Sequence, residues 1–259
     1  MPKSLPWCIA HRGARDEAPE NTISAFERAL RYPIDGIELD VQMSADGAAV
    51  VYHDATLYRV IGRRFPVASR TRSQLAEIDW GRWFDKSFAG EPLNTLEQTL
   101  TQFGARTRLL IEIKSSLADR KAGRSEALTR LVIRLLAQKP EAIPNAHIHV
   151  LSFDSEVLSL AHGLAPHWRY VLNVPEREAE KIMAWPEAWL NPLWGVDVRI
   201  DHWTPKLATW AKARGLKTFT YTCNTTRQVQ KALGLNLDGI ISDRPGWLNR
   251  YLAQRRHAD

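Results

Sequence analysis

The sequence predicts a closed (β/α)₈ barrel, an α/β fold, with a small insertion after the second strand. Short apolar runs alternate with amphipathic segments from one end of the chain to the other, eight of each. A length of 259 residues suits a barrel of this kind, which typically needs roughly 250 residues. Strand followed by helix, repeated in this way, is typical of a parallel sheet covered by helices. An open, doubly wound sheet is the alternative.

The predicted strands are short apolar runs, and the predicted helices have apolar residues at helical spacing. The strands are expected at residues 5–10, 35–41, 108–113, 147–153, 169–174, 194–199, 216–222 and 237–242. The helices are expected at residues 22–31, 95–103, 126–138, 156–162, 176–189, 206–214, 226–233 and 247–254. We expect residues 1–259 to form a single domain, since one core of this size accommodates the whole chain.

Two features interrupt the simple alternation after the second strand. Residues 48–52 follow an Asp46-Gly47 turn and are predicted to form an extra strand of a hairpin. Residues 55–93 then form a long insertion. It contains a set of arginines with no acidic residue among them, followed by four aromatic residues: Arg59, Arg63, Arg64, Arg70, Arg72, Trp80, Trp83, Phe84 and Phe88. Long loops in compact domains are usually functional, so we expect a lid or substrate-selecting cap over one end of the barrel.

The charge balance limits the choice of partner. The chain carries 35 Lys and Arg against 29 Asp and Glu, a formal net charge of +6, and 44% of its residues are hydrophobic. This composition excludes a disordered chain, a fibrous repeat and a disulfide-stapled miniprotein. Because the positive charge is spread along the chain, it indicates attraction for small anionic ligands and no nucleic-acid partner.

The cysteines and the apolar segments indicate a cytoplasmic protein. Cys8 and Cys223 are too few for a disulfide framework and too far apart for a metal knuckle, so each is expected to be a buried apolar residue in a reducing compartment. The first ten residues lack the hydrophobic region and cleavage site of a signal peptide. No run of about 18 apolar residues occurs, so we expect no stable membrane insertion.

Ionisable residues lie inside two strands that otherwise read as apolar. In the second strand, period-two alternation places Glu38 and Asp40 on the face opposite Ile37, Leu39 and Val41. In the third strand, Glu112 and Lys114 share a face in the same way, and Leu109, Ile111 and Ile113 share the other. The three carboxylates are therefore expected to converge inside the barrel, where they suit one divalent cation such as Mg²⁺, Mn²⁺ or Ca²⁺. The alternative is a buried network of ion pairs.

Two histidines follow strands directly, at the barrel end where such folds place their chemistry. His11 begins the segment His11-Arg12-Gly13 after the first strand, and His53 follows the extra strand. Imidazole titrates near neutral pH, so the two histidines form a candidate acid and base pair. Arg12 and Lys114 add fixed positive charge of the kind that clamps a phosphate.

Polar residues at other strand ends are less diagnostic. Asn224 and Asp243 are expected either to contact substrate or to cap the helices that follow, and capping is the preferred interpretation for Asp243. Asn21 is a candidate N-cap of the first helix. Glu20 and Asn21 also lie nine and ten residues past His11 on the same rim, so a role in supporting the site is equally open.

The combined motifs resemble the glycerophosphodiester phosphodiesterase family, in particular its compact cytosolic bacterial members. The segments that carry this resemblance span nearly the whole chain: 11–13, 19–22, 36–41, 46–47, 50–54, 112–114, 152–153, 221–224 and 239–245. The resemblance implies a TIM-type barrel and hydrolysis of glycerophosphodiesters, such as glycerophosphocholine or glycerophosphoethanolamine, to glycerol 3-phosphate and an alcohol.

Residue roles follow from the resemblance by position. It makes Glu38, Asp40 and Glu112 the metal ligands, with Mg²⁺ or Ca²⁺ as the cation, and it makes His11 and His53 the catalytic pair. Arg12 and Lys114 would contact the phosphate, and Glu20 and Asn21 would support the site. Tyr221 stands where the family usually has Trp, and it keeps an aromatic wall beside the substrate.

Two other functions remain open at this point. The same barrel could cleave lysophospholipids at a membrane surface, as a lysophospholipase D does, although no anchor or basic amphipathic helix is found. A non-catalytic phosphate- or metal-binding barrel is the third hypothesis, and the completeness of the residue set argues against it. We expect a monomer or a homodimer.

Overall fold

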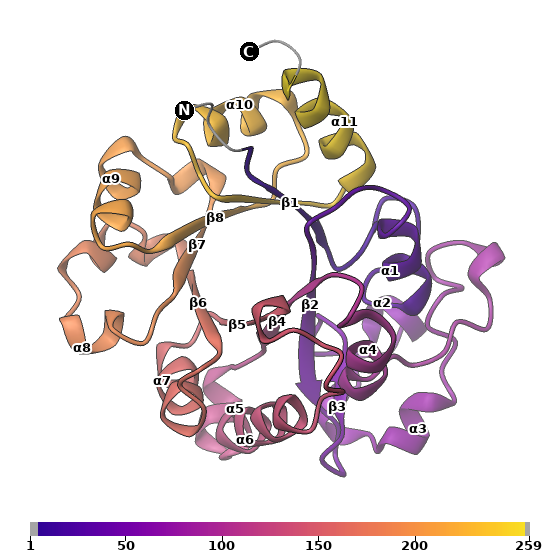
Figure 1. The fold of residues 1–259 in the computed structure, drawn as a ribbon. Coiled ribbons are helices and arrows are strands. Elements are labelled where there is room, and N and C mark those ends of the chain that lie inside the picture. Colours follow the sequence, from indigo (N-terminus) through magenta and orange to yellow (C-terminus); the bar gives the residue numbers. More distant parts are fainter. Residues whose placement is uncertain (1–4, 257–259) are drawn as a thin grey trace.

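The computed structural model describes residues 5–256 and confirms the predicted barrel. Its strands form one sheet in the order β1-β9-β8-β7-β6-β5-β4-β2-β3, and an additional pairing between β1 and β2 closes the ring. All neighbours in the ring are parallel, and only β3 pairs in the antiparallel sense, with β2. Figure 1 shows the closed ring of strands surrounded by helices. An open sheet is thereby excluded.

The strands agree with the predicted ranges to within a few residues at either end. They are β1 (Trp7–His11), β2 (Gly36–Met43), β3 (Ala49–Val51), β4 (Arg108–Ile113), β5 (Ile148–Ser152), β6 (Arg169–Val174), β7 (Gly195–Arg199), β8 (Lys217–Tyr221) and β9 (Gly239–Ser242). β3 is the predicted extra strand, and Val51 lies opposite Val41 of β2 in this hairpin.

Most of the predicted helices are present on the outside of the barrel. They are α1 (Ile23–Ala29), α4 (Leu96–Phe103), α6 (Arg124–Ala137), α7 (Ser155–Leu164), α9 (Pro205–Ala213), α10 (Thr226–Gly234) and α11 (Pro245–Arg256). Short helices add to these: α2 (Tyr58–Ile61), α3 (Arg72–Ala76), α5 (Leu117–Lys121) and α8 (Glu187–Leu190). Among the described residues, no helix combines the length and the apolar character needed to cross a membrane.

The prediction of one continuous helix over residues 176–189 is wrong. The segment contains two 3₁₀ turns, Glu176–Glu178 and Lys181–Ala184, and then α8. Trp185 has an extended backbone, with φ −66° and ψ 147°. Because it precedes Pro186, whose ring disfavours a helical conformation in the preceding residue, the helix cannot continue through this point.

The first helix is capped by Thr22 and not by Asn21. The Thr22 side chain accepts a hydrogen bond from the backbone N–H of Ala25, as an N-cap residue does. Asn21 instead adopts a left-handed conformation with φ 64°, which asparagine tolerates better than most residues. Its side chain is consequently free to turn into the barrel.

Alternation along the strands produces two separate apolar layers. The outward residues of the strands join the helices in the main core, which includes Ile37, Leu39 and Ile111. The inward residues at mid-height fill the barrel with a small apolar cluster: Ile9, Leu110, Leu151, Val171, Phe219 and Ile241. The barrel is therefore a packed core at this level, and polar side chains are left for its two ends.

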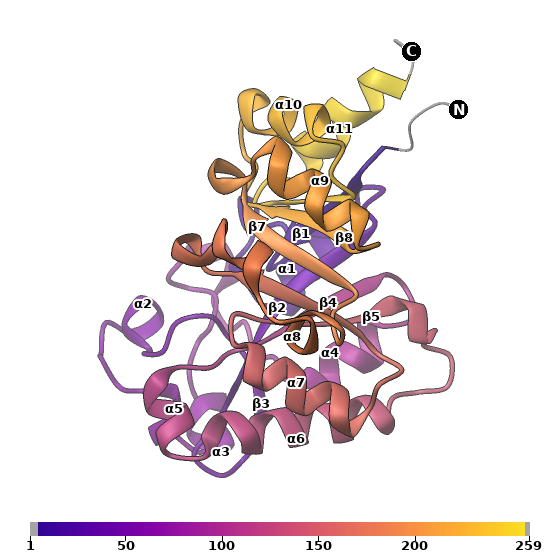
Figure 2. The same ribbon diagram turned by 90° about the vertical axis from the view of Figure 1, so that its left-hand side faces the viewer.

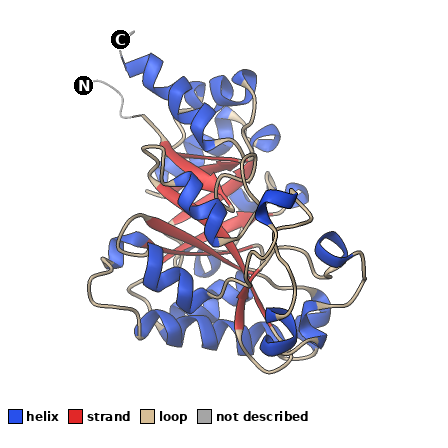
Figure 3. Cartoon of the chain, turned by 90° about the vertical axis from the view of Figure 1, so that its right-hand side faces the viewer, coloured by secondary structure: helices blue, strands red, loops and turns tan. Residues whose placement is uncertain are grey.

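The insertion at residues 55–93 packs against the flank of the barrel. Its apolar side chains form a third cluster with Val50 and Tyr52: Leu57, Val67, Leu75, Trp80 and Leu93. In Figures 1 and 2, α2 and α3 lie outside the ring of strands, and Figure 3 shows this loop-rich segment beside the shell of helices. Burial of these side chains against the β3 hairpin holds the segment beside the barrel, and the expected cap over the barrel opening stays a prediction.

Candidate active site

A cavity of about 310 Å³ lies at the carboxyl ends of the barrel strands. It is lined by His11, Arg12, Arg15, Glu38, His53, Glu112, Lys114, Leu151, Phe153, Asn173, Asp197, Tyr221, Thr222 and Ile241. Three larger hollows, of about 570, 620 and 410 Å³, lie at the other end of the barrel, between α7 and the segment after α8, and between residues 176–181 and 201–204. None of them is lined by a predicted site residue, so the smaller cavity is the place where the candidate chemistry gathers.

Three buried carboxylates meet on the inward faces of two neighbouring strands. Asp40 of β2 lies opposite Glu112 of β4 in the sheet register, and Glu38 is two residues before Asp40 on the same face. One carboxylate oxygen from each of the three lies within 4.8 Å of the other two. The predicted convergence of Glu38, Asp40 and Glu112 is therefore confirmed.

These carboxylates perturb one another strongly. Burial, followed by the charges of Asp40 and Glu112, raises the pKa of Glu38 well above its usual value. Burial also raises the pKa of Glu112. Burial acts in the same direction on Asp40, but the Arg12 guanidinium and the Lys114 ammonium outweigh it and hold the pKa of Asp40 below its usual range.

The cluster of three carboxylates has the properties of a metal-ion site. Lys114 Nζ lies 2.7 Å from Glu112 Oε1 and 3.4 Å from Asp40 Oδ1, and Arg12 Nε lies 3.0 Å from Asp40 Oδ2. Two positively charged side chains thus face three carboxylates. Asp40 Oδ1 is buried without a hydrogen-bond partner among the described residues. Hard carboxylate oxygens with unfilled acceptor capacity fit Mg²⁺ or Ca²⁺.

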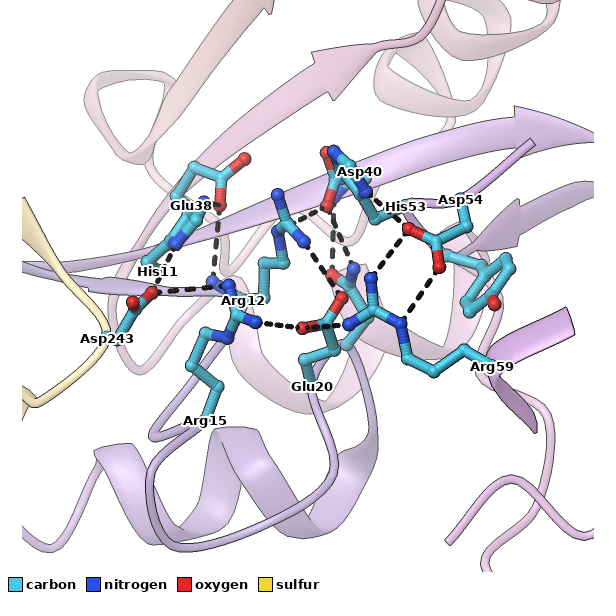
Figure 4. A network of polar contacts seen from close by, with 12 residues as sticks. His11, Arg12, Arg15, Glu20, Glu38, Asp40, His53, Asp54, Arg59 and Asp243 are labelled. Atoms are coloured by element: carbon cyan, nitrogen blue, oxygen red, sulfur yellow. Dashed lines mark hydrogen bonds and ion pairs between the residues drawn. The ribbon is translucent and has the colours of Figure 1, made fainter. Parts of the chain in front are cut away.

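Arg12 is held in place by two carboxylates. Its backbone is in the left-handed region, with φ 56°, and its side chain reaches both Asp40 and Glu20, whose Oε1 accepts a 2.8 Å hydrogen bond from Arg12 Nη1. Glu20 also pairs with Arg15 and Arg59 at 2.7 and 2.8 Å. This single buried carboxylate therefore anchors three arginines beside the cavity (Figure 4).

His11 is oriented by the last strand of the barrel. Its Nδ1 lies 2.6 Å from Asp243 Oδ1, and its Nε2 lies 3.8 Å from Glu38 Oε2. Burial lowers the pKa of His11. Burial alone would raise the pKa of Asp243, but the hydrogen bond and charge of His11 bring it down to about 2. The Asn224 amide donates a 2.7 Å hydrogen bond to Asp243 Oδ2, so Asn224 supports this pair.

His53 has a matching arrangement on the other side of the cavity. Its Nδ1 lies 2.8 Å from Asp54 Oδ1, and Arg59 holds Asp54 through two hydrogen bonds of 2.8 and 2.7 Å. Burial lowers the pKa of His53. Figure 4 shows the two histidine–aspartate pairs on either side of the Arg12–Glu20 contact. Each aspartate favours the tautomer with a proton on Nδ1, which leaves Nε2 available for proton transfer.

The cavity gathers most of the residues predicted from the sequence. His11, Arg12, Glu38, His53, Glu112, Lys114 and Tyr221 line it. Asp40, Glu20, Asn21 and Asn224 are not among its lining residues. Asp40 and Glu20 hold Arg12, which lines it, and Asn224 holds Asp243, the partner of His11. Asn21 Nδ2 donates a 2.9 Å hydrogen bond to Asp40 Oδ2, a contact that the capping of α1 by Thr22 makes possible.

Several residues of the site were not identified from the sequence. Arg15 and Arg59 pair with Glu20, Asp54 lies 2.8 Å from His53, and the preferred capping role for Asp243 missed its contact with His11. Asn173 and Asp197 also line the cavity. Both are polar residues at inward positions of otherwise apolar strands, which is the same signal that identified Glu38 and Glu112. The residues next to them in the sequence gave no further indication of a site, because neither Asn173 nor Asp197 adjoins a histidine or an arginine.

The chain is similar to known proteins over nearly its whole length. A model of the glycerophosphoryl diester phosphodiesterase family matches residues 11–247. A glycerophosphodiester phosphodiesterase from Caldanaerobacter subterraneus subsp. tengcongensis is 31% identical over 238 residues, which cover 92% of this chain and 93% of that protein. A glycerophosphodiester phosphodiesterase from Bacillus subtilis is 28% identical over 249 residues, covering 92% and 83%.

Solved structures show the same similarity. An Oleispira antarctica phosphodiesterase, solved in complex with the product sn-glycerol-3-phosphate, matches with a TM-score of 0.82 and 26% identity, over 96% of this chain and 97% of that one. A glycerophosphodiester phosphodiesterase from Agrobacterium tumefaciens matches with a TM-score of 0.73 and 25% identity, over 95% and 100% of the two chains.

Proposed function

The chain belongs to the glycerophosphoryl diester phosphodiesterase family, and on that premise we propose that its cavity hydrolyses glycerophosphodiesters to glycerol 3-phosphate and an alcohol with one divalent cation. The family makes it a phosphoric diester hydrolase. The observation that carries the proposal is the convergence of three carboxylates, two cations and two oriented histidines on one cavity. The product bound to the Oleispira antarctica relative supports glycerol 3-phosphate as the product here.

Glu38, Asp40 and Glu112 would hold the cation. When bound, a divalent cation supplies Lewis-acid stabilisation of the negative charge that develops on the phosphoryl oxygens. Arg12 and Lys114 act on the same oxygens through fixed positive charge. Because Arg12 is fastened to Glu20 and Asp40, its position is set before substrate arrives, which lowers the reorganisation required during the reaction.

The two histidines share the proton transfers. His11, held by Asp243, removes a proton from the nucleophile, and His53, held by Asp54, protonates the departing alkoxide. Burial lowers the pKa of His11, which favours the neutral imidazole that a base requires. The nucleophile is either water or the neighbouring glycerol hydroxyl acting through a cyclic phosphate, and the same pair serves both routes.

The substrate class includes glycerophosphocholine and glycerophosphoethanolamine. The enzyme acts in the cytoplasm as a monomer or homodimer, without a nucleic-acid partner. Both cysteines are buried free thiols, which supports a reducing compartment.

A metal-depleted assay with histidine variants tests this function. The purified protein is stripped of metal, supplied with Mg²⁺, Mn²⁺ or Ca²⁺ in turn, and assayed for release of glycerol 3-phosphate. His11→Ala and His53→Ala should each lower kcat by at least about 100-fold, while the exposed control His167→Ala retains parental activity. Full activity in the presence of a chelator, or in either histidine variant, would contradict the proposal.

A further inference from the structure

One half of the cavity has no role in the chemistry described above. The groups that act directly in the proposed function come from β1 to β4 and the loops that follow them: the three carboxylates, both histidines, Arg12 and Lys114. On the opposite side, Asn173 of β6 and Asp197 of β7 lie directly opposite each other in the sheet register. Their side chains line the cavity and are only 3% and 2% exposed.

These two side chains offer hydrogen-bond acceptors that nothing in the described part of the chain uses. Asn173 Nδ2 donates a 3.1 Å hydrogen bond to Glu112 Oε2, so the remaining Asn173 atom, Oδ1, only accepts. Asn173 Oδ1 and Asp197 Oδ1 are both buried without a hydrogen-bond partner. A buried acceptor without a donor costs free energy, so these oxygens favour a ligand that brings donors.

The two free acceptor oxygens limit which part of the substrate can bind beside them. A phosphoryl group carries acceptors and no donor, so it does not match these oxygens and is drawn to Arg12 and Lys114. A trimethylammonium group has no N–H to donate. A glycerol moiety carries two hydroxyls, each an O–H donor, and its terminal hydroxyl brings one donor to this pair of neighbouring acceptors.

The rim of the same half is apolar and open. Phe153 and Tyr221 meet edge to face with ring centroids 6.1 Å apart, and Phe153 is 40% exposed. An alcohol arm of variable size requires an opening toward solvent, which the rim provides and the buried floor does not. The glycerol arm is small and constant, and it fits the floor.

We propose that Asp197 and Asn173 bind the terminal hydroxyl of the substrate's glycerol arm and thereby select glycerophosphodiesters over substrates in which that hydroxyl is acylated. This assignment rests on the proposed function and adds a specificity-determining pair to it. An acyl ester at the terminal oxygen removes the O–H donor and enlarges the arm, and leaves Asp197 buried without a donor. Sites built to bind a hydroxyl reject analogues that lack it strongly.

The test compares three substrates that share the choline head group: glycerophosphocholine, its analogue lacking the terminal hydroxyl, and its derivative acetylated at that hydroxyl. All three keep the phosphate and the hydroxyl next to it. The parent enzyme should prefer glycerophosphocholine in kcat/KM by at least about 100-fold. Asp197→Leu, which has similar volume and no acceptor, should bring the three substrates within about threefold of one another.

Two further variants separate specificity from structure. Asp197→Asn keeps an acceptor oxygen and should retain most of the parental preference. Asp201→Leu makes the same change at a solvent-exposed aspartate outside the cavity lining and should retain all of it. Cation affinity, measured by calorimetry, should be unchanged in Asp197→Leu. Equal preference in the parent and in Asp197→Leu, a parent without preference, or a loss of cation affinity in the variant would each overturn the assignment.

A binding experiment with the reaction product tests the hydroxyl subsite independently of hydrolysis. Calorimetry with glycerol 3-phosphate and with its analogue lacking the terminal hydroxyl measures the same discrimination without turnover. If the parent hydrolyses no glycerophosphodiester yet discriminates between these ligands through Asp197, the proposed function fails and the hydroxyl subsite stands. If the parent hydrolyses them and binds both ligands equally, the subsite fails and the function stands.

Discussion

His11 and His53 show how single side chains acquire a role from their partners. Each ring meets an aspartate at Nδ1, and each aspartate is held in turn, Asp243 by Asn224 and Asp54 by Arg59. A histidine alone is free to rotate and to exchange tautomers. The aspartate fixes both properties and would stabilise a positively charged ring in the proposed proton transfer.

Asp243 is therefore predicted to act as a positioning residue for His11. Asp243→Asn keeps the shape of the side chain but loses the charge that favours the proton on Nδ1 of His11. We expect kcat to fall by at least about 100-fold, with KM changed by less than about threefold. Steady-state kinetics on glycerophosphocholine measure both values. Asp16→Asn, at an aspartate outside the cavity lining, is the matched control, and an unchanged kcat in Asp243→Asn would remove the positioning role.

The two ends of the barrel carry different kinds of inward-facing side chains. At the carboxyl ends of the strands, the inward positions carry the polar groups of the cavity. At the other end, the inward position of β5 is His149, which packs between Trp7 and Trp194 with ring centroids 5.6 and 5.0 Å away. Burial of a titratable ring in this aromatic layer links the stability of the fold to pH.

His149 should make the protein sensitive to mild acid. Burial lowers the pKa of His149 from 6.5 to about 3, so the folded protein excludes a proton that the unfolded chain binds. The stability contribution is complete above the unfolded pKa of 6.5 and is lost as pH falls from there toward 3. The loss amounts to about 2 kcal/mol of unfolding free energy by roughly pH 5. Urea unfolding of the parent and of His149→Phe at several pH values measures it, and the variant should lose less stability in acid. Equal pH slopes would refute this account.

The insertion reaches the site through Arg59, which pairs with Asp54 and Glu20, and it is fastened to the barrel by a separate apolar cluster. Leu75 of α3 is fully buried in the cluster that fastens residues 55–93 to β3. Leu75→Ala should lower the free energy of unfolding by about 3 kcal/mol and leave kcat/KM within about twofold of the parent, because no residue of the insertion lines the cavity. Ser73→Ala on the exposed face of the same helix is the control for urea unfolding. A large change in KM with little change in stability would restore the role of a substrate-selecting cap.

At the scale of the whole molecule, the electrostatic repulsion among the site's carboxylates is concentrated where β1 pairs with β2 and closes the ring of strands. Three buried carboxylates share a small volume at β2 and β4, next to the pairing of β1 with β2. Arg12 and Lys114 offset part of this repulsion. A divalent cation would offset the rest, and any ligand that binds only the folded state stabilises it.

Cation binding should therefore be visible as thermal stability. At about 100 times the dissociation constant, a cation adds about 2.7 kcal/mol, which for a chain of this size corresponds to a rise in Tm of roughly 5–10 °C. Scanning calorimetry with a chelator and then with each divalent ion measures this rise. The double variant Glu38→Gln, Glu112→Gln should lose the rise and unfold at a higher temperature than the parent when a chelator is present. An equal rise in the double variant would place the cation elsewhere.

The sequence by itself determined the barrel, the inward carboxylates and the two histidines at strand ends. Each of these follows from local rules. Alternation assigns a residue to a face, and the position after a strand assigns it to the end of the barrel where parallel strands finish. Residues such as Glu38 and Glu112 were identified because an ionisable side chain on a buried face needs a partner.

The tertiary structure alone decided which of these side chains meet. The pairing of His11 with Asp243, 232 positions apart, depends on the pairing of β1 with β9 in the sheet. The position of the insertion and the opposition of Asn173 to Asp197 depend on packing and on sheet register. Local patterns place a side chain on a face and at a height, whereas its contacts depend on how separate strands are aligned around the barrel.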